Sequence, residues 1–451
     1  MPQLHVSRRT ALIALAWMMC GWAQPASGQD APVAPAPARQ EHVHVVAPAL
    51  IPTREASGTS WQPDITPMAG SHRRWGAWDV RANGAAFLTV VGESRDRHRT
   101  GGPGSLEAGG RNWGMLQARR GAAEGRVGIR AMLSAEPWTT AHCGTISYLA
   151  TGEVCDGDLV HDREPPSDLL MELAADYERP LGRGWRVQIY AGLAGEPALG
   201  PPSHAHRASA TVNPLGPIGH HWLEATTAFG LVTAAVHTSR WKVEWSTFNG
   251  RAPDERRTDV DPGAFDSSSM RVTYLPSSRL ALQVSGARLH EARSEFPYTL
   301  PDPFTRVTAS ALYSRPVGRS SLWATTLAGG WNRGAEIVPG GSFRQPTGAA
   351  LVESSVLSGR HSVFGRAELA ELPGHHLHVL ESSTSVFVVG KLQAGYVREF
   401  NAGRGLVVGA GGTLAFSVMP ATLAARYPGR VAPTFGVFLS LRGARHTMSA
   451  G

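Results

Sequence analysis

The chain has 451 residues, of which 18% are charged and 42% hydrophobic, and its formal net charge is +7. Soluble domains have roughly 25% charged residues, so this composition is low for a soluble enzyme. No run of about 18 apolar residues occurs, which excludes a helical membrane protein. The 13 Trp, 13 Phe and 8 Tyr argue against disorder. What remains is a β-rich chain with many glycine-containing turns.

Residues 1–28 have the pattern of a secretory signal peptide. Arg8 and Arg9 precede the apolar stretch Ala11 to Gly21, and small residues lead up to Gly28. A basic start, a short apolar core and a small-residue cleavage site are typical of such signals. We therefore expect export from the cytoplasm, and we expect no nucleic-acid partner.

Residues 29–70 are rich in Pro and Ala without a regular period, and they predict an extended periplasmic leader. From Trp75 onward the dominant signal is alternation of apolar and polar residues. In Trp185 to Leu193, for example, one face is apolar and the other carries Arg186 and Gln188. Such alternation predicts strands with one apolar and one polar face. About sixteen such segments occur, near 75–92, 111–120, 125–134, 168–178, 183–193, 223–237, 240–249, 267–275, 279–290, 303–315, 320–332, 349–358, 362–371, 385–399, 404–418 and 433–442.

The connectors between these segments alternate strictly between short and long. Thr238-Ser239 is a short one, whereas 135–167 and 194–222 are long. A soluble sandwich has no need to place every long loop at one end, but an outer-membrane barrel has short periplasmic turns and long outer loops. Only a closed ring of strands satisfies all backbone polar groups in lipid. The predicted fold is all-β, a transmembrane up-and-down antiparallel barrel of about sixteen strands in a Gram-negative outer membrane, over 71–442 with a tail at 443–451.

Aromatic residues near the strand ends are placed as interfacial girdles require. Sheet-core packing is the alternative for each of them taken singly. The set is Trp75, Trp78, Trp113, Trp185, Trp222, Trp241, Tyr313, Trp323, Trp331 and Tyr396.

The polar strand faces predict a charged lumen. At about sixteen strands a barrel is wide enough for an aqueous channel, so the default expectation is a water-filled pore for small hydrophilic solutes. The alternative is that the charges pair across the lumen and hold a plug loop. The predicted lumen-facing charges are Glu172, Asp176, Arg186, Lys242, Glu244, Arg271, Arg306, Arg366, Glu368 and Lys391.

Two cysteines remain once Cys20 leaves with the signal peptide. Cys143 and Cys155 are twelve residues apart, and in an oxidising compartment this spacing predicts one disulfide that closes a loop. The loop-entropy model gives such a closure about 3 kcal/mol. A metal site built on these cysteines is the alternative.

Histidines cluster in the predicted outer loops. Neutral imidazole is a good ligand for copper and zinc, and closely spaced histidines assemble a site easily. Copper or zinc is the candidate ion, and solvated loop histidines are the alternative. The candidate ligands are His142, His161, His204, His206, His220, His221, His375, His376 and His378.

Motifs of catalysis are missing from the sequence. It has no Gly-rich phosphate loop, HExxH helix or G-x-S-x-G elbow. His237 and Ser239 lie close together, but in a predicted short periplasmic turn. We expect no enzyme.

Several segments form a set that matches a family. They are Gly58–Trp61, His142–Gly144, Leu149–Cys155, His161–Arg163, Asp168–Ala174, Arg179–Gly182, Gly195–Gly200, His220–Trp222 and Phe248–Arg251. Together they resemble an uncharacterised family of proteobacterial outer-membrane β-barrel proteins, whose members tend to be encoded near copper and heavy-metal resistance functions. Relatives carry further histidines near His161, where this chain has Pro165, Pro166 and Ser167. This departure weakens a metal inference at that loop.

Two functions follow as expectations. The first is a porin-like channel for small hydrophilic solutes, with the resemblance implying a link to copper or heavy-metal handling. The second is a non-conducting surface protein whose disulfide- and histidine-bearing outer loops bind metal or a partner. Expected partners are outer-membrane lipid, lipopolysaccharide, the barrel assembly machinery, and small solutes or metal ions. The sequence does not fix the oligomeric state.

Overall fold

The computed structural model describes most of the chain beyond the predicted signal peptide. The described residues are 51–94, 105–290, 303–317, 321–338 and 341–446. The predicted signal peptide (1–28), the first part of the predicted leader and the end of the tail lie outside them. No helix in these described ranges is long and apolar enough to span a membrane.

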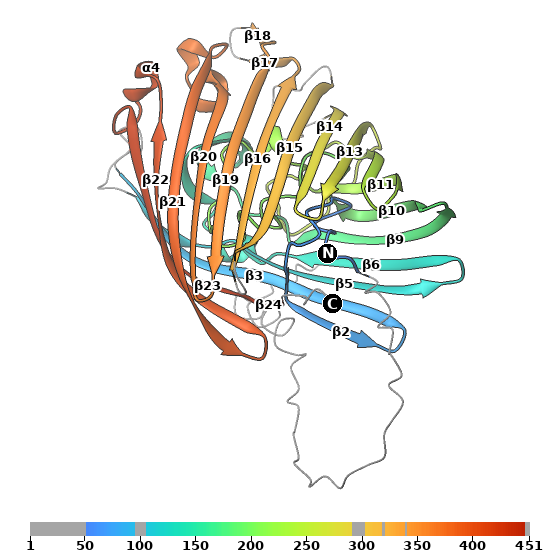
Figure 1. The fold of residues 1–451 in the computed structure, drawn as a ribbon. Coiled ribbons are helices and arrows are strands. Elements are labelled where there is room, and N and C mark those ends of the chain that lie inside the picture. Colours follow the sequence, from blue (N-terminus) through green and yellow to red (C-terminus); the bar gives the residue numbers. More distant parts are fainter. Residues whose placement is uncertain (1–50, 95–104, 291–302, 318–320, 339–340, 447–451) are drawn as a thin grey trace, which may run out of the picture.

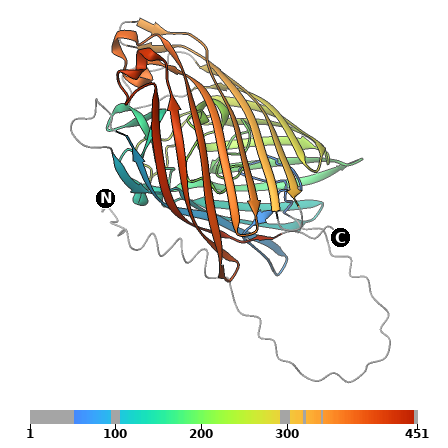
Figure 2. The same cartoon turned by 60° about the vertical axis from the view of Figure 1, so that its left-hand side comes forward.

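Sixteen antiparallel strands of the described chain close into a barrel (Figures 1 and 2), which confirms the predicted fold class. Each strand pairs with the next along the chain, and β23 closes the ring on β3. The barrel strands are β3 (Trp78–Glu93), β5 (Asn112–Ala122), β6 (Gly125–Leu133), β9 (Leu170–Gly182), β10 (Trp185–Gly195), β11 (Ala228–His237), β12 (Trp241–Phe248), β13 (Ser267–Ser277), β14 (Leu280–Leu289), β15 (Phe304–Val317), β16 (Ser321–Arg333), β19 (Thr347–Ser358), β20 (His361–Pro373), β21 (Val386–Gly403), β22 (Leu406–Val418) and β23 (Val431–Gly443).

Short strands supplement this ring. β2 (Ser71–Trp75) extends the sheet beside β3, and β1 (Met68–Ala69) pairs with β24 (Arg445–His446). The other short elements lie in the connections between barrel strands. They are β4 (Leu106–Gly109), α2 (Glu136–Thr139), β7 (Thr145–Cys155), β8 (Asp158–Glu164), α3 (His220–Leu223), β17 (Glu336–Val338), β18 (Gly341–Phe343), η1 (Gly374–Leu377), η2 (Leu380–Ser382) and α4 (Ala421–Ala424).

Alternation along the strands separates an outer from an inner face. On β9, Leu173 and Tyr177 are exposed, while Glu172, Asp176 and Glu178 are buried. Successive strand residues point to opposite faces, so the apolar side chains face outward to lipid and the charged ones face the lumen. The polarity is the reverse of a soluble protein, as the sequence predicts.

Two of the turns fall later in the chain than predicted. Strands β9 and β21 continue through the expected connectors, and the chain reverses at Arg183-Gly184 and Arg404-Gly405. All four of these residues have positive φ, between 52° and 80°. Two-residue hairpin turns with two such residues match the twist of the flanking strands, which explains why the strands extend up to them.

Most of the predicted girdle aromatics lie on the outer surface. Trp75, Trp185, Trp241, Trp323, Trp331 and Tyr396 are all exposed. The prediction is wrong for Trp113 and Trp222, which are 7% and 4% exposed. Trp113 falls on the lumenal face of β5 and packs on His206, with ring centroids 4.4 Å apart. Trp222 belongs to α3, and its Nε1 donates to Thr347 Oγ1.

Candidate functional site

The predicted lumenal charges lie under other parts of the chain, not along an exposed wall. Nine of the ten are buried, and Arg186 is part-exposed and paired with Glu178. Two internal segments cover most of them, and Lys391 lies under a third, the outer hairpin of β7 and β8. We call residues 51–67 the leader segment and residues 196–227, between β10 and β11, the inward loop. The nine buried charges are Glu172, Asp176, Lys242, Glu244, Arg271, Arg306, Arg366, Glu368 and Lys391.

The leader segment folds back on itself inside the barrel, where an extended leader was expected. Arg54 pairs with Asp64 at 2.7 Å, and Glu55 and Trp61 form an isolated antiparallel bridge. Gly58 sits in the turn between them with φ of +51°, a conformation that glycine adopts without steric cost. The result is a compact loop.

Trp61 anchors the leader segment to the barrel wall. It is 6% exposed and packs with Leu275, Ala281 and Leu312. Its ring also lies 5.3 Å from the ring of His237 in an edge-on arrangement. Burying an aromatic ring of this size contributes several kcal/mol, so this contact accounts for much of the docking.

Ion pairs at Glu55 complete the docking. Its carboxylate accepts hydrogen bonds from Arg119 (2.7 Å) on β5 and Arg130 (2.8 Å) on β6. Burial by itself would raise the pKa of Glu55, but the charges of Arg119 and Arg130 outweigh it and hold the pKa well below its usual range. Lys242 and Arg271 add hydrogen bonds to Thr59. The leader segment is therefore bound through charges of the wall.

The inward loop crosses the lumen from one side of the wall to the other. Near its start, Ala198 N donates to Ser246 on β12, and further along Asn213 exchanges hydrogen bonds with Gln393 on β21. The alternation of short and long connectors predicts a long outer loop over 194–222. Its polar side chains match polar groups on the lumenal wall, and this is why it folds inward.

Arg207 is the central side chain of the inward loop. It is 0% exposed and pairs with Glu353 on β19 (2.6 Å) and with Glu224 of the same loop (2.5 Å). Glu353 pairs in turn with Arg366 on β20 at 3.1 Å. Burial disfavours the charged form of Arg207, but the two carboxylates raise its pKa above the usual range. The loop is tied to the wall by a buried charge network.

The leader segment and the inward loop touch each other. Ser57 Oγ donates to Glu196 Oε2 at 2.6 Å, and Ser203 N donates to Ser57 Oγ at 3.3 Å. Burial raises the pKa of Glu196 to about 7. A cavity of about 90 Å³ borders both segments and one of about 160 Å³ borders the inward loop, both below the roughly 300–1,000 Å³ of small-molecule sites. The middle of the lumen is occupied.

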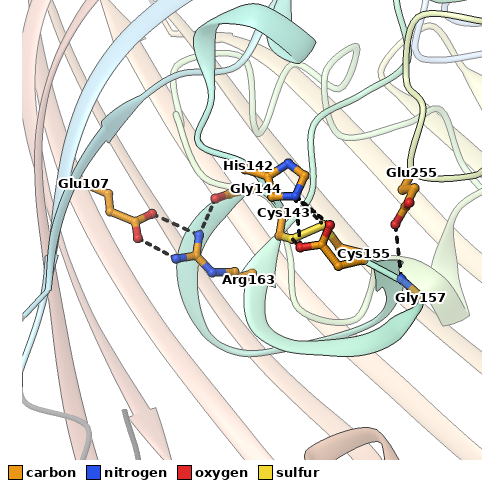
Figure 3. Close-up of a disulfide and its surroundings, with 9 residues drawn as sticks. Glu107, His142, Cys143, Gly144, Cys155, Gly157, Arg163 and Glu255 are labelled. Atoms are coloured by element: carbon orange, nitrogen blue, oxygen red, sulfur yellow. Dashed lines mark hydrogen bonds and ion pairs between the residues drawn. A yellow bond between two sulfur atoms is a disulfide. The ribbon is translucent and has the colours of Figure 1, made fainter. Parts of the chain in front are cut away.

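A third insertion, the outer hairpin of β7 and β8, folds against the inner wall at the outer end. Lys391 on β21 donates to Ser147 (3.0 Å), and Tyr427 donates to Asp162 (3.1 Å). The predicted disulfide is present (Figure 3): it joins Cys143, just before β7, to Cys155, the last residue of β7 beside the hairpin turn, with a Cα separation of 5.5 Å. It leaves neither sulfur as a thiolate ligand, so the alternative of a cysteine metal site does not hold here.

Polar contacts beside the disulfide hold the hairpin in place. Arg163 pairs with Glu107 at 2.7 Å and donates to the Gly144 carbonyl (Figure 3). Exposed His142 lies 2.9 Å from Asp156. These contacts are the surface pairs of a structural loop.

The candidate histidine ligands do not form one site. His204 faces Glu224 at 3.0 Å, and burial lowers its pKa to about 4. His161 and His378 meet edge to face with ring centroids 4.9 Å apart. The rings of His220 and His221 lie 4.0 Å apart at a tilt of 40°, and His206 packs on Trp113. Among the described residues, His375 and His376 both lie against one carboxylate oxygen, that of Glu336.

Sequence reasoning missed several of these functional residues. Arg119, Arg130 and Glu353 lie on lumenal strand faces, and extending the alternation along β5, β6 and β19 would have found them. Glu55, Arg207 and Glu336 lie in aperiodic segments, where no sequence signal marks them.

No protein-family model matches this chain, and no curated protein matches it. Solved structures of outer-membrane channels are similar. The channel DcaP of Acinetobacter baumannii has 10% identity over 83% of this chain and 99% of its own, with a TM-score of 0.47. The anion-selective porin from Comamonas acidovorans has 13% identity over 81% of this chain and 99% of its own, with a TM-score of 0.44. OmpF of Salmonella typhi has 10% identity over 82% of this chain and 100% of its own, with a TM-score of 0.49. At these identities the similarity concerns the fold alone, and what this chain's own strand pairing shows is a closed barrel of sixteen antiparallel strands.

Proposed function

We propose that this protein is an outer-membrane channel for small hydrophilic solutes, closed in the conformation described here by the leader segment and the inward loop. The observation that carries the proposal is the charged inner face of a sixteen-strand barrel. Barrels of this size enclose a lumen wide enough for water. A barrel that served only as an anchor would not need a polar lumen.

The contacts that hold the leader segment in the lumen favour a channel that can open, as opposed to a barrel that is permanently filled. Apart from the Trp61 anchor, the leader segment is held by ion pairs and hydrogen bonds to the wall, such as Glu55 to Arg119 and Lys242 to Thr59. Water can replace these hydrogen bonds when the segment is released, so the net free-energy cost of breaking them is modest. Apolar contacts have no such replacement in water. The leader segment precedes the first barrel strand, so its release breaks no barrel ladder.

A second candidate is a non-conducting surface protein, and the occupied lumen itself favours it. On this view the leader segment and the inward loop are permanent, and the outer loops carry the function. A link to copper or heavy-metal handling is compatible with either candidate. Its support is the family resemblance and the histidines of the outer loops.

Planar-bilayer conductance separates the two candidates. We would compare the full mature chain with the triple variant Glu55→Ala/Trp61→Ala/Arg207→Ala, which removes the ion pairs and the anchor of the leader segment and the central ion pairs of the inward loop. A channel predicts rare steps for the native chain and frequent ohmic steps for the variant. Arg240→Ala, in an exposed periplasmic turn, is the matched control and should conduct as the native chain does. Silence from this triple variant, if circular dichroism shows it to be folded, would favour the surface protein.

A further inference from the structure

Two outer loops meet at one carboxylate oxygen. Glu336 begins β17, in the connection between β16 and β19, and His375 and His376 lie in η1, in the connection between β20 and β21. Glu336 Oε2 lies 2.5 Å from His375 Nε2 and 3.2 Å from His376 Nε2. Two imidazole nitrogens from successive residues therefore converge on the same oxygen. We call these three residues the rim cluster.

The hydrogen bonds of His375 determine which of its two ring nitrogens carries the hydrogen and which one is an acceptor. His375 Nδ1 lies 3.0 Å from the backbone carbonyl oxygen of Ser383. A carbonyl can only accept, so Nδ1 carries the hydrogen. In the neutral ring, Nε2 then presents a lone pair to Glu336 Oε2, another acceptor. Two acceptors at 2.5 Å repel each other unless a proton or a cation lies between them.

The same arrangement is the one that metal-ligating histidines adopt. Such a histidine almost always donates its other ring N–H to a carbonyl or carboxylate, which sets its tautomer and its orientation. The Ser383 carbonyl plays this part for His375. It also comes from the loop beside η1, so one short segment supplies two ligands and the group that orients one of them.

Packing holds the three side chains in place before any ion arrives. His375 is 7% exposed, and its ring lies 5.2 Å from the ring of Phe343 on β18. The two imidazole rings are 4.4 Å apart at 74°. Glu336 keeps a third of its side chain exposed, which leaves an approach from solvent.

We propose that the rim cluster binds one divalent transition-metal ion, zinc or copper(II). The three ligand atoms all lie within 4.8 Å of one another. An ion held at about 2.0–2.2 Å from nitrogen and oxygen ligands would need only a small widening of the His375–Glu336 contact. Two imidazoles and one carboxylate suit zinc and copper(II), whereas calcium and magnesium prefer all-oxygen sites. The remaining positions are open to water or a ligand.

Binding at the rim cluster would connect two neighbouring outer loops. Apart from the rim cluster, a hydrogen bond from Gln345 Nε2 to the Thr384 carbonyl joins these loops. An ion shared by β17 and η1 would fix them more firmly, whether or not the barrel conducts. The inference therefore stands or falls separately from the proposed channel.

The test is metal titration of the full mature chain, folded in detergent, by calorimetry with zinc and by electron paramagnetic resonance with copper(II). We expect one equivalent per chain and nitrogen hyperfine coupling from two imidazoles. His375→Ala/His376→Ala should lower the affinity at least 30-fold, and Glu336→Gln about 10-fold, in line with the loss of metal ligands and their supports. The rim variants should keep the circular dichroism of the native barrel, because all three residues lie outside the barrel strands.

The control variant is His142→Ala/His361→Ala, which removes two exposed histidines elsewhere. It should bind as the native chain does, and it also tests the group beside the disulfide. Unchanged binding by the folded His375→Ala/His376→Ala variant would overturn the proposal. So would loss of binding in the control, or a copper spectrum without coupling from two imidazoles.

Discussion

Asp176 and Glu55 both pair with Arg119, at 3.0 and 2.7 Å, yet they reach it by different routes. Asp176 lies on β9, where alternation alone turns it toward the lumen. Glu55 lies in the leader segment, 64 residues before its partner, and no local pattern directs it there. The barrel wall thus follows from the local alternation of residues along each strand. The segments inside the barrel are instead placed by charged side chains on the lumenal face of the wall. Variants that disturb the segments inside the barrel and leave its strands intact test this distinction.

The largest effect is expected from Arg207→Ala. The change leaves Glu224 and Glu353 buried without their main counter-charge, which costs about 3–5 kcal/mol. Because the partners are a loop and the wall, we expect the inward loop to undock while the barrel stays closed. Limited proteolysis should cut within residues 196–227, and the barrel should keep its strand circular dichroism. An intact inward loop would show that Arg207 is not its main tie.

The next largest effect is expected from breaking the disulfide with Cys143→Ser/Cys155→Ser. Its closure contributes about 3 kcal/mol in the loop-entropy model, but only to the outer hairpin of β7 and β8. We expect protease sensitivity in this hairpin and no change in the melting of the barrel. A fall in barrel melting temperature would mean that wall and contents are not separable there.

Glu196→Gln should alter the contact between leader segment and inward loop in a pH-dependent way. The pKa of Glu196 is raised from 4.5 to about 7 by burial, so closure favours its protonated form. The stability that the protonated Glu196 gives to the closed conformation is fully present below pH 4.5 and is lost as the pH rises through about 7. Gln stays neutral and still accepts the Ser57 hydrogen bond. The shift exceeds two pKa units, each worth about tenfold, so we expect conductance at pH 8 to be at least tenfold lower in the variant. At pH 4 the two proteins should conduct alike, and a constant ratio at all pH values would contradict this role of Glu196.

The smallest effect is expected from Gly58→Val. Residue 58 has φ of +51°, and a Cβ there would lie 3.0 Å from the Glu196 carbonyl oxygen. A branched side chain in this conformation costs roughly 1–3 kcal/mol, so the leader segment should dock more weakly and conductance should rise. Gly76→Val is the matched control, because Gly76 has φ of +57° but nothing within 4 Å. Equal conductance in both variants would mean that the close approach to Glu196 is unimportant.

The sequence by itself determined the wall of this barrel. The period of two is local, and lipid outside and a polar lumen inside fix which face each residue takes. The sixteen predicted segments therefore correspond to the sixteen strands. The disulfide was also accessible, because two cysteines twelve residues apart have one way to pair within the chain.

Only the tertiary structure decided what fills the barrel. Arg207 meets Glu353 across 146 residues, and Lys391 meets Ser147 across 244. Trp113 turns inward onto His206 of the inward loop, and Trp222, which belongs to that loop, donates to Thr347 on the wall. Glu336 joins His375 and His376 because two loops on neighbouring strands fold toward each other. Aperiodic segments carry no signal of their destination, since their positions depend on charges and cavities that exist only once the wall has closed.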